Sequence, residues 1–273
     1  MLFQCFASGS DGNCYYIGDY TRGVLIDAGI GIRMIRQNLR ALGLDLYNIM
    51  GVLVTHDHTD HVRTVSVLAN KHHIPIYATE KVHAGIDHNP RVHPKIDSSC
   101  RRTIQKDVPF EICGLSVQPF GVAHDSVDCV GYSIRGEGWT MTLATDIGHV
   151  SDHLAEHIRQ SNIVVVEANY DPAMLENGPY PFHLKERIRS GSGHLANDEC
   201  GRLLAENYHS GLKQIFLCHL SQMNNKPDTA YAAVCQRLTE AGVQVGTDVE
   251  VAPLARLRPS KLIQLETLSM STH

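Results

Sequence analysis

The sequence contains no run of about 18 or more apolar residues, the length that a membrane-spanning helix needs. Its first residues lack the basic segment and the small-residue cleavage site of a secretory signal. A surplus of positive charge is missing as well: the formal net charge is −5, so the chain as a whole does not attract nucleic acid or anionic lipid. We therefore expect a cytoplasmic protein without membrane contact, in which nucleic-acid binding depends on a local basic patch.

Low-complexity segments and internal repeats are also missing. The 8 cysteines form no C-x-x-C pair, which in a cytoplasmic chain indicates reduced thiols, many of them buried in the core. Apolar residues make up 43% of the chain and charged residues 19%, which is typical of a globular protein.

Short apolar runs separated by turn residues alternate with helical patterns along the whole chain. The runs predict strands at residues 2–7, 14–17, 24–26, 52–54, 115–117, 132–134, 141–144, 163–166 and 215–218. This alternation is α/β, and the strands are spread too evenly for two separate folds. We predict one domain over residues 1–261 and a polar, poorly ordered C-terminal tail over 262–273.

Three helices are predicted from spacing and end signals. Apolar residues at helical spacing over 32–42 are followed by Gly43, the residue type that commonly ends a helix. Acidic residues after Asn197 predict the start of a second helix, which Gly211 would end. The last helix is expected over about 229–241.

The strongest functional signal is the segment His56-x-His58-x-Asp60-His61, directly after a strand of the buried type. Three imidazoles and a carboxylate within six residues suit a divalent metal ion such as Zn²⁺. His56 and His58 are two apart in an extended segment, so they point the same way and can share one ion. Asp60 and His61, at the start of the following helix, point to a second position. A polar loop with coincidental histidines is the alternative, and this density disfavours it.

Three more candidate ligands follow other predicted strands, where α/β folds collect ligands. They are His124, Asp146 and His219. Each is weak evidence alone, because a histidine after a strand is usually solvated. Together with the six-residue cluster they complete two metal shells, bridged by Asp146.

These motifs, in this order, resemble those of the metallo-β-lactamase superfamily. Within it, Phe6-Ala7-Ser8-Gly9-Ser10-x-Gly12-Asn13, Gly193-His194-Leu195-x-Asn197 and His219-Leu220-Ser221-x-x-Asn224-Asn225 resemble the YycJ (WalJ/VicX) subgroup. The resemblance spans roughly residues 1–257. It implies a metallo-β-lactamase αββα four-layer sandwich with a dinuclear metal site at one edge of the two sheets.

The implied chemistry is hydrolysis by two divalent metal ions, with Zn²⁺ or Mn²⁺ expected and Fe²⁺ an option. Two ions about 3.5–4 Å apart lower the pKa of a shared water and supply hydroxide as the nucleophile near neutral pH. The resemblance implies a phosphodiesterase acting on nucleic acid, specifically a 5′-3′ DNA exonuclease with a role in DNA repair or replication. The oligomeric state is not predicted.

His194 is the candidate proton donor, because nuclease branches of the superfamily carry a histidine in a similar place. Glu167, at the end of the run 163–166, would hold and orient its ring. With the ligand Asp60, this pair forms the predicted catalytic set. The alternative roles of His194 are those of a helix cap, a turn residue or an additional metal ligand.

A local basic segment precedes His194. Lys185, Arg187 and Arg189, with the Ser-Gly-Ser-Gly stretch 190–193, are predicted to form a flexible approach that binds substrate phosphates. An ordinary solvated helix face is the alternative. The loop 8–13 either reaches the metal edge or is only a hairpin turn. His83 and the other histidines between the ligand motifs are expected at the surface.

Two other functions remain open. A thioester, lactone or β-lactam hydrolase would use the same two ions in a closed apolar pocket, without needing His194, and the net charge of −5 suits it. A regulatory metal-binding module with little turnover is the third possibility, which the complete ligand set disfavours.

Overall fold

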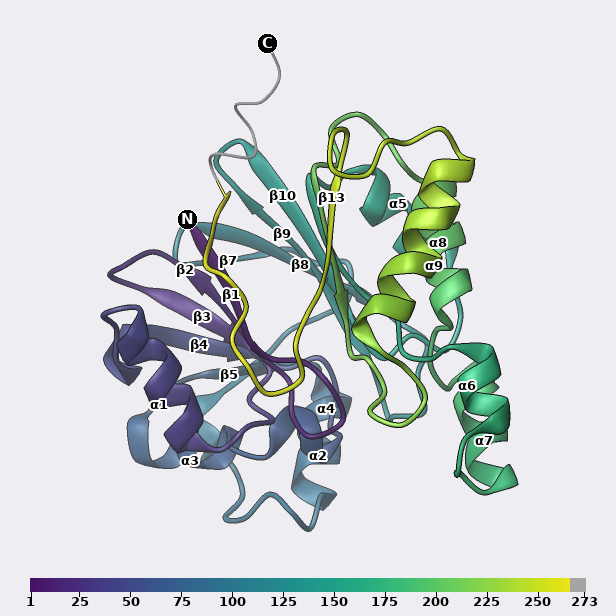
Figure 1. The fold of residues 1–273 in the computed structure, drawn as a ribbon. Coiled ribbons are helices and arrows are strands. Elements are labelled where there is room, and N and C mark those ends of the chain that lie inside the picture. The colour runs from purple at the N-terminus through teal and green to yellow at the C-terminus, as the bar shows by residue number, and fades with distance from the viewer. Residues whose placement is uncertain (266–273) are drawn as a thin grey trace.

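The computed structural model describes residues 1–265, which form two seven-stranded sheets packed face to face (Figure 1). Helices cover the outer face of each sheet, so the layers follow the order helix, sheet, sheet, helix. The predicted αββα sandwich in a single α/β domain is confirmed.

The first sheet comes mainly from the N-terminal half of the chain. Its strands, in spatial order, are β14 (Ile263–Gln264), β1 (Leu2–Ala7), β2 (Cys14–Gly18), β3 (Gly23–Ile26), β4 (Ile49–Leu53), β5 (Ile76–Ala78) and β6 (Arg101–Thr103). Neighbours are antiparallel from β14 to β3 and parallel from β3 to β6. The helices on its side are α1 (Ile32–Ala41), α2 (Thr59–Val62), α3 (Val65–His72) and α4 (Glu80–His88).

The second sheet comes from the C-terminal half. Its strands, in spatial order, are β13 (Glu250–Pro253), β12 (Gln214–Cys218), β11 (Ile163–Glu167), β10 (Trp139–Ala144), β9 (Val130–Gly136), β8 (Leu115–Gly121) and β7 (Phe110–Ile112). Neighbours are parallel from β13 to β10 and antiparallel from β10 to β7. The helices on its side are α5 (Asp152–Arg159), α6 (Pro172–Asn177), α7 (Phe182–Arg189), α8 (Asn197–Glu206) and α9 (Pro227–Glu240).

Among residues 1–265 the four layers enclose three large apolar cores, one between the sheets and one under each helical layer, and a small fourth cluster includes residues of α6 and α7. The position of strand β11 between two cores explains why its sequence is an unbroken apolar run. Ile163 and Val165 face the core between the sheets, whereas Val164 and Val166 face the helices. A strand covered on both faces has no solvent side, so alternation with polar residues disappears. Burying each such side chain contributes about 1.5–3 kcal/mol.

The topology brings the carboxyl ends of several strands to the same edge of the sandwich. Strands β3 and β4 are parallel in the first sheet, and β10, β11 and β12 are parallel in the second. Strand β8 runs in the same direction as β10, because both are antiparallel to β9. The segments that carry the predicted ligands follow these strands, so they meet at this edge (Figure 1).

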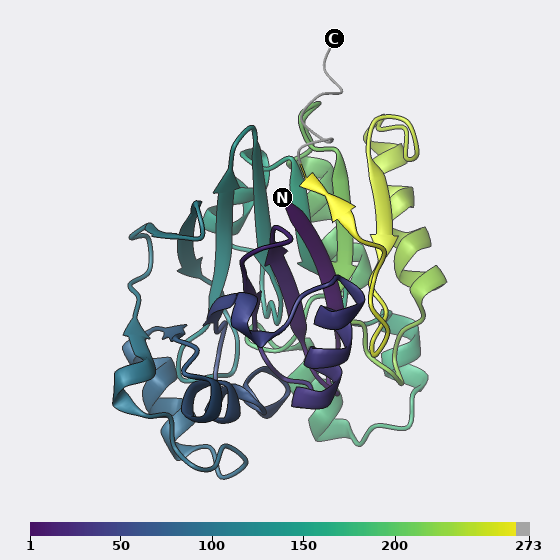
Figure 2. The ribbon, with the colours of Figure 1, turned by 90° about the vertical axis from the view of Figure 1, so that its left-hand side faces the viewer.

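Four expectations are corrected by the structure. The sequence 262–265 belongs to the domain, because β14 pairs with β1 beside the N-terminus (Figure 2); residues 266–273 of the predicted tail lie outside the described residues. Helix α8 ends at Glu206, short of Gly211. The segment 182–189 is helix α7, so Lys185, Arg187 and Arg189 lie on a helix and not on a flexible loop. His83 is buried at 5% exposure, because α4 turns it toward the carbonyl of Arg102.

Among the described residues, none of the helices has the length and apolar character that a membrane crossing requires.

Candidate metal centre

The seven predicted ligands meet at the edge where the strands end. The nearest ligand atoms of His56, His58 and His124 lie within 4.8 Å of one another, and those of Asp60, His61 and His219 form a second such group. Asp146 lies between the two groups. Its Oδ2 is 3.2 Å from His61 Nε2, and its Oδ1 is 3.7 Å from His124 Nε2. Asp146 therefore contacts both groups, as the bridging position requires.

The segment after β4 places four of these ligands because it turns directly into a helix. His58 is the N-cap residue of α2, with extended backbone, and Asp60 and His61 occupy the first turn. The loop is clamped by its neighbours: the amide of Asn13 donates to the carbonyl of Asp60 at 2.8 Å. A Cβ on Gly29 would lie 1.5 Å from that carbonyl oxygen, so only glycine fits there.

Three acidic or imidazole side chains at this edge stand on left-handed backbone. Asp27 follows β3 with φ of 59°, Asp146 follows β10 with 56°, and His219 follows β12 with 54°. Non-glycine residues in this conformation cost about 1–3 kcal/mol and persist where the surrounding structure enforces them. All three stand at or just after the end of a strand, and their side chains belong to the network of contacts around the candidate ligands.

Four ligand rings use Nδ1 for a protein contact and leave Nε2 to face the centre. Nδ1 of His61 donates to Asp27 at 2.7 Å, and Nδ1 of His124 donates to the carbonyl of Gly193 at 2.9 Å. Nδ1 of His219 donates to Glu167 at 2.9 Å, and Nδ1 of His56 is 3.0 Å from Thr55 Oγ1. This arrangement is typical of metal-binding histidines, since the partner of Nδ1 sets the tautomer and the ring orientation.

The residues present fit divalent metal ions. Nε2 of His56, His124 and His219 is buried and has no hydrogen-bond partner among residues 1–265. Buried imidazole nitrogens without partners are costly unless a ligand uses them. Burial lowers the pKa of His219, but Asp146, Asp60 and Glu167 outweigh it and raise the pKa to about 10. These carboxylates make the centre attractive to cations, and a metal ion would displace the proton from this ring.

His194 lies beside the centre and shares a carboxylate with a ligand. Its Nδ1 donates to Glu167 Oε1 at 2.9 Å, the same oxygen that accepts from His219. The other oxygen of Glu167 accepts the backbone amides of Ile147 and Leu195 at 2.7 and 3.0 Å. Burial raises the pKa of Glu167, but the two imidazoles lower it to about 2, so the group is an anion near neutral pH.

The backbone before His194 is fixed by close packing. A Cβ on Gly193 would lie 2.2 Å from the carbonyl oxygen of Arg187, and the carbonyl of Gly193 accepts from His124. The amide of His194 donates to Ile188 at 2.9 Å. His194 is therefore held between α7 and a metal-ligand ring, and its side chain is 18% exposed.

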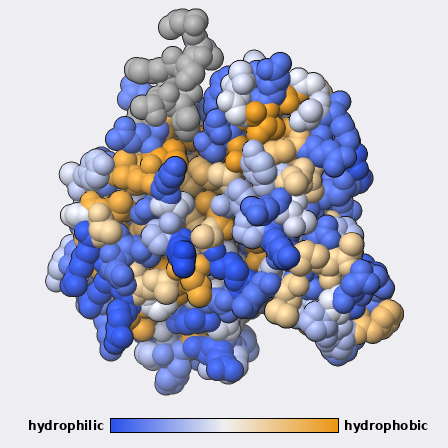
Figure 3. Space-filling view, viewed as in Figure 1, coloured by the Kyte–Doolittle hydropathy of each residue, from blue (hydrophilic) through white to orange (hydrophobic). Residues whose placement is uncertain are grey.

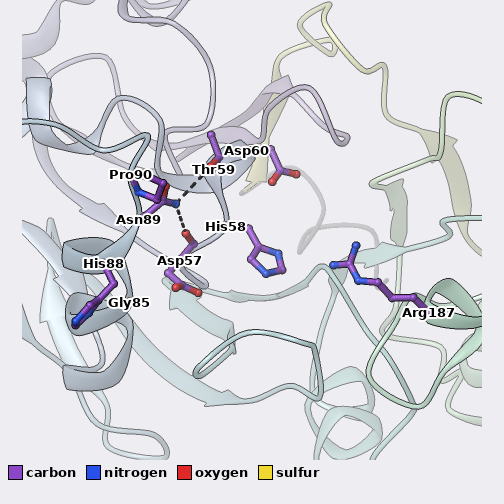
Figure 4. A pocket seen from close by; sticks show the side chains of 9 residues that line it. All are labelled: Asp57, His58, Thr59, Asp60, Gly85, His88, Asn89, Pro90 and Arg187. Carbon is purple, nitrogen blue, oxygen red and sulfur yellow. Dashed lines mark hydrogen bonds between the residues drawn. The ribbon is translucent and has the colours of Figure 1, made fainter. Parts of the chain in front are cut away.

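The three basic residues of the predicted phosphate approach have different surroundings. Lys185 donates to the carbonyl of Glu176, and Arg189 pairs with the carboxylate of Glu176 at 3.1 Å, so both are turned toward α6. Arg187 forms an ion pair with Asp125 at the metal edge. In Figure 4 its guanidinium lies across the gap from His58 and Asp60.

An open hollow of about 500 Å³ lies over the metal edge. Its lining is Asp57, His58, Thr59, Asp60, Gly85, His88, Asn89, Pro90 and Arg187 (Figure 4). Most of these side chains are polar or charged. The hollow therefore differs from the closed apolar pocket expected for a hydrolase of small apolar substrates.

Several residues that hold the ligands were not predicted. Asp27 supports His61, Asn169 donates to the carbonyl of His219 at 2.8 Å, and the hydroxyl of Ser8 accepts the amide of His219 at 2.9 Å. Asn13 Nδ2 is 2.9 Å from His61 Nε2, so the loop 8–13 does reach the metal edge. Ser8 and Asn13 belong to the loop whose contact with the metal edge was one of the two expectations, and Asp27 follows a buried strand as the predicted ligands do.

Replacing Asp27 with asparagine is expected to weaken metal binding by about 10–100-fold, because an amide cannot hold the His61 tautomer as a carboxylate does. Competition with a chromogenic chelator measures the affinity. The matched control is Asp19→Asn, an aspartate on the loop after β2 whose carboxylate caps Thr21. Equal affinities for the two variants would contradict the supporting role of Asp27.

Comparison with known proteins agrees with this geometry. The model of the family described as "Beta-lactamase superfamily domain" matches residues 22–219. An exodeoxyribonuclease YycJ from Bacillus anthracis is 33% identical over 262 residues, which are 96% of this chain and 98% of that protein. An exodeoxyribonuclease WalJ from Streptococcus pneumoniae is 32% identical over 249 residues, covering 91% of this chain and 92% of that one.

A solved structure shares the fold at lower identity. The metallo-beta-lactamase fold protein YhfI from Bacillus subtilis superposes with a TM-score of 0.67 and 14% identity, covering 96% of this chain and all of that one. At this identity the likeness concerns the fold alone.

Proposed function

The chain belongs to the beta-lactamase superfamily, among relatives of the exodeoxyribonucleases YycJ and WalJ, and we propose that it is a metal-dependent 5′-3′ exodeoxyribonuclease. The observation that carries the proposal is that the two groups of candidate ligands and the candidate proton donor lie together at the metal edge. Two groups of ligands share Asp146, and His194 stands beside them on the carboxylate of Glu167. A role in DNA repair or replication follows from this activity.

The proposed centre holds two divalent ions, Zn²⁺ or Mn²⁺, with Fe²⁺ as a further option. His56, His58 and His124 would hold one ion, Asp60, His61 and His219 the other, and Asp146 both. When bound, such a pair supplies a nucleophile from water near neutral pH and neutralises charge at the attacked phosphorus. Imidazole and carboxylate donors suit these ions, and the choice among them depends on availability in the cell.

The chain's own residues would guide the departure of the leaving group. Glu167 fixes Nδ1 of His194 as a donor, so Nε2 is the nitrogen available to the substrate. We place His194 as the proton donor to the 3′ oxygen that leaves, because an unprotonated alkoxide is a poor leaving group. Arg187, at the rim of the hollow, would bind a substrate phosphate. Lys185 and Arg189 would contribute only to the field around the rim, since both are tied to Glu176.

The polar, open hollow favours nucleic acid over a small apolar ester. A strand of DNA must enter and leave at its end, which an open groove permits and a closed pocket does not. The surface seen in Figure 3 is largely hydrophilic, with smaller hydrophobic areas.

Within the described residues all 8 cysteines are free thiols, and most are buried. This supports the further proposal that the protein works in the reducing cytoplasm.

The test of this function is degradation of end-labelled DNA in the presence of Mn²⁺ or Zn²⁺, beside a thioester and a lactone. Stepwise shortening from the 5′ end that a chelator stops would support the proposal. Turnover of the thioester or lactone with intact DNA would overturn it and favour the small-molecule alternative. Single-stranded RNA in parallel would show whether the enzyme discriminates by sugar.

A further inference from the structure

A second hollow of about 580 Å³ lies beside the one at the metal edge and is lined by Thr59, Arg63 and Arg91. Thr59 lines both hollows, so the two meet at this residue. The second hollow therefore adjoins the first at Thr59, which directly precedes Asp60 in the sequence. None of its lining residues belongs to the predicted site.

Arg63 and Arg91 line this hollow without an acidic partner in the described part of the chain. Both are exposed, and neither pairs with a carboxylate within residues 1–265. Seven other arginines do form ion pairs with carboxylates among the described residues, namely Arg101, Arg159, Arg187, Arg189, Arg202, Arg237 and Arg256. In a chain with a net charge of −5, two guanidinium groups without carboxylate partners that converge on one hollow form a local positive site.

The two arginines are attached to the ligand segment by short backbone links. Arg63 follows α2, and its amide donates to the carbonyl of Thr59 at 3.0 Å. Asn89 donates to the carbonyl of Asp57 at 2.8 Å and accepts the amide of Arg91 at 3.0 Å. These hydrogen bonds fix the backbone of both arginines relative to the ligand segment. The side chains are exposed and can contact a ligand.

We propose that this second hollow binds backbone phosphates of the DNA strand whose end lies at the metal centre. The chemistry it recognises is a polyanion with regularly spaced phosphates, because arginine binds phosphate oxygens through two parallel N–H donors. Such contacts hold and align a strand without reading its sequence. The inference rests on the proposed nuclease function. It adds a location for the part of the strand that has not yet been cleaved.

The experiment compares the metal-loaded wild type with the double variant Arg63→Gln/Arg91→Gln. Arg135→Gln is the matched control, an exposed arginine at the far end of β9 that contacts Gln160. We measure kcat/KM at several salt concentrations on a short single-stranded oligonucleotide and on bis(p-nitrophenyl) phosphate, which is too small to span both hollows. The double variant is expected to lose about tenfold in kcat/KM on the oligonucleotide, mainly through KM, and less on the small diester.

The salt dependence gives a second readout that a folding defect would not produce. Each phosphate contact to a single strand contributes about 0.7 to the slope of log affinity against log salt, so removing two should flatten the slope by about 1.4. An unchanged slope, or equal losses on both substrates, would overturn the inference and leave the nuclease function standing. A wild type that does not degrade DNA would overturn the proposed function, and this inference with it.

Discussion

Replacing Asp146 with alanine is expected to abolish DNA degradation and to remove bound metal. Its two carboxylate oxygens lie 3.2 Å from His61 Nε2 and 3.7 Å from His124 Nε2, so it stands where a ligand shared by the two proposed ions would. Its side chain is only 3% exposed, and water cannot readily take its place. Charge stabilisation by metal ions is worth several kcal/mol, which corresponds to roughly a thousandfold or more in rate.

Metal content by mass spectrometry and the rate of DNA shortening together measure this effect. Asp152→Ala is the matched control, because Asp152 is exposed in the first turn of α5 and has no part in the centre. The control should keep both metal and activity. An Asp146→Ala protein that holds a full complement of metal and degrades DNA at the wild-type rate would remove the basis of the proposed mechanism.

Replacing His194 with alanine is expected to lower kcat on DNA by about 10²–10⁴-fold while metal content stays unchanged. His194 contacts the centre through Glu167 and is 18% exposed. By contrast, Nε2 of His56, His124 and His219 is buried without a partner in the described residues. A proton donor matters for a leaving alkoxide and hardly at all for p-nitrophenolate, which leaves without protonation. The variant should therefore lose far less on bis(p-nitrophenyl) phosphate than on DNA.

Two further variants separate the possible roles of His194. Glu167→Gln should lower both kcat and metal affinity, because Oε1 of Glu167 serves His194 and the ligand His219 together. His183→Ala, an exposed histidine on α7, is the control and should change neither. Loss of metal in the His194→Ala protein would make His194 a ligand, and equal losses on both substrates would make it structural.

Much of the metal centre was predictable because its signals are local in the chain. Four ligands lie within His56 to His61, and the expected start of a helix at Asp60 is confirmed by α2. The remaining ligands each follow an apolar strand, and strand direction alone brings such positions to one edge of the sandwich. The pairing of Glu167 with His194 followed from the resemblance to a known superfamily, and the 2.9 Å hydrogen bond now gives it a geometry.

Most of the wrong predictions concern how a side chain is placed by tertiary packing, which a local sequence pattern does not specify. A basic stretch with alternating charges fits a loop or a helix face equally well, and packing of α7 beside α6 decides that Lys185 and Arg189 turn away from the centre. His83 has a polar sequence environment but is buried, because its side of α4 faces the sheet. Residues 262–265 read Leu-Ile-Gln-Leu, so an apolar signal for the strand that pairs with β1 was present, and the prediction of a polar tail overlooked it.

By itself, the sequence determined which chemistry is available: imidazoles and carboxylates at the ends of apolar strands, in an order and spacing that allow two metal sites. Only the tertiary structure decided which groups support them and where a substrate can lie. Asp27 and His61 are 34 residues apart, and Glu167 and His219 are 52 apart. Contacts over such separations depend on strand order, helix rotation and burial, which the whole fold sets together. For the same reason, Arg63 and Arg91 meet in one hollow only after the chain has folded.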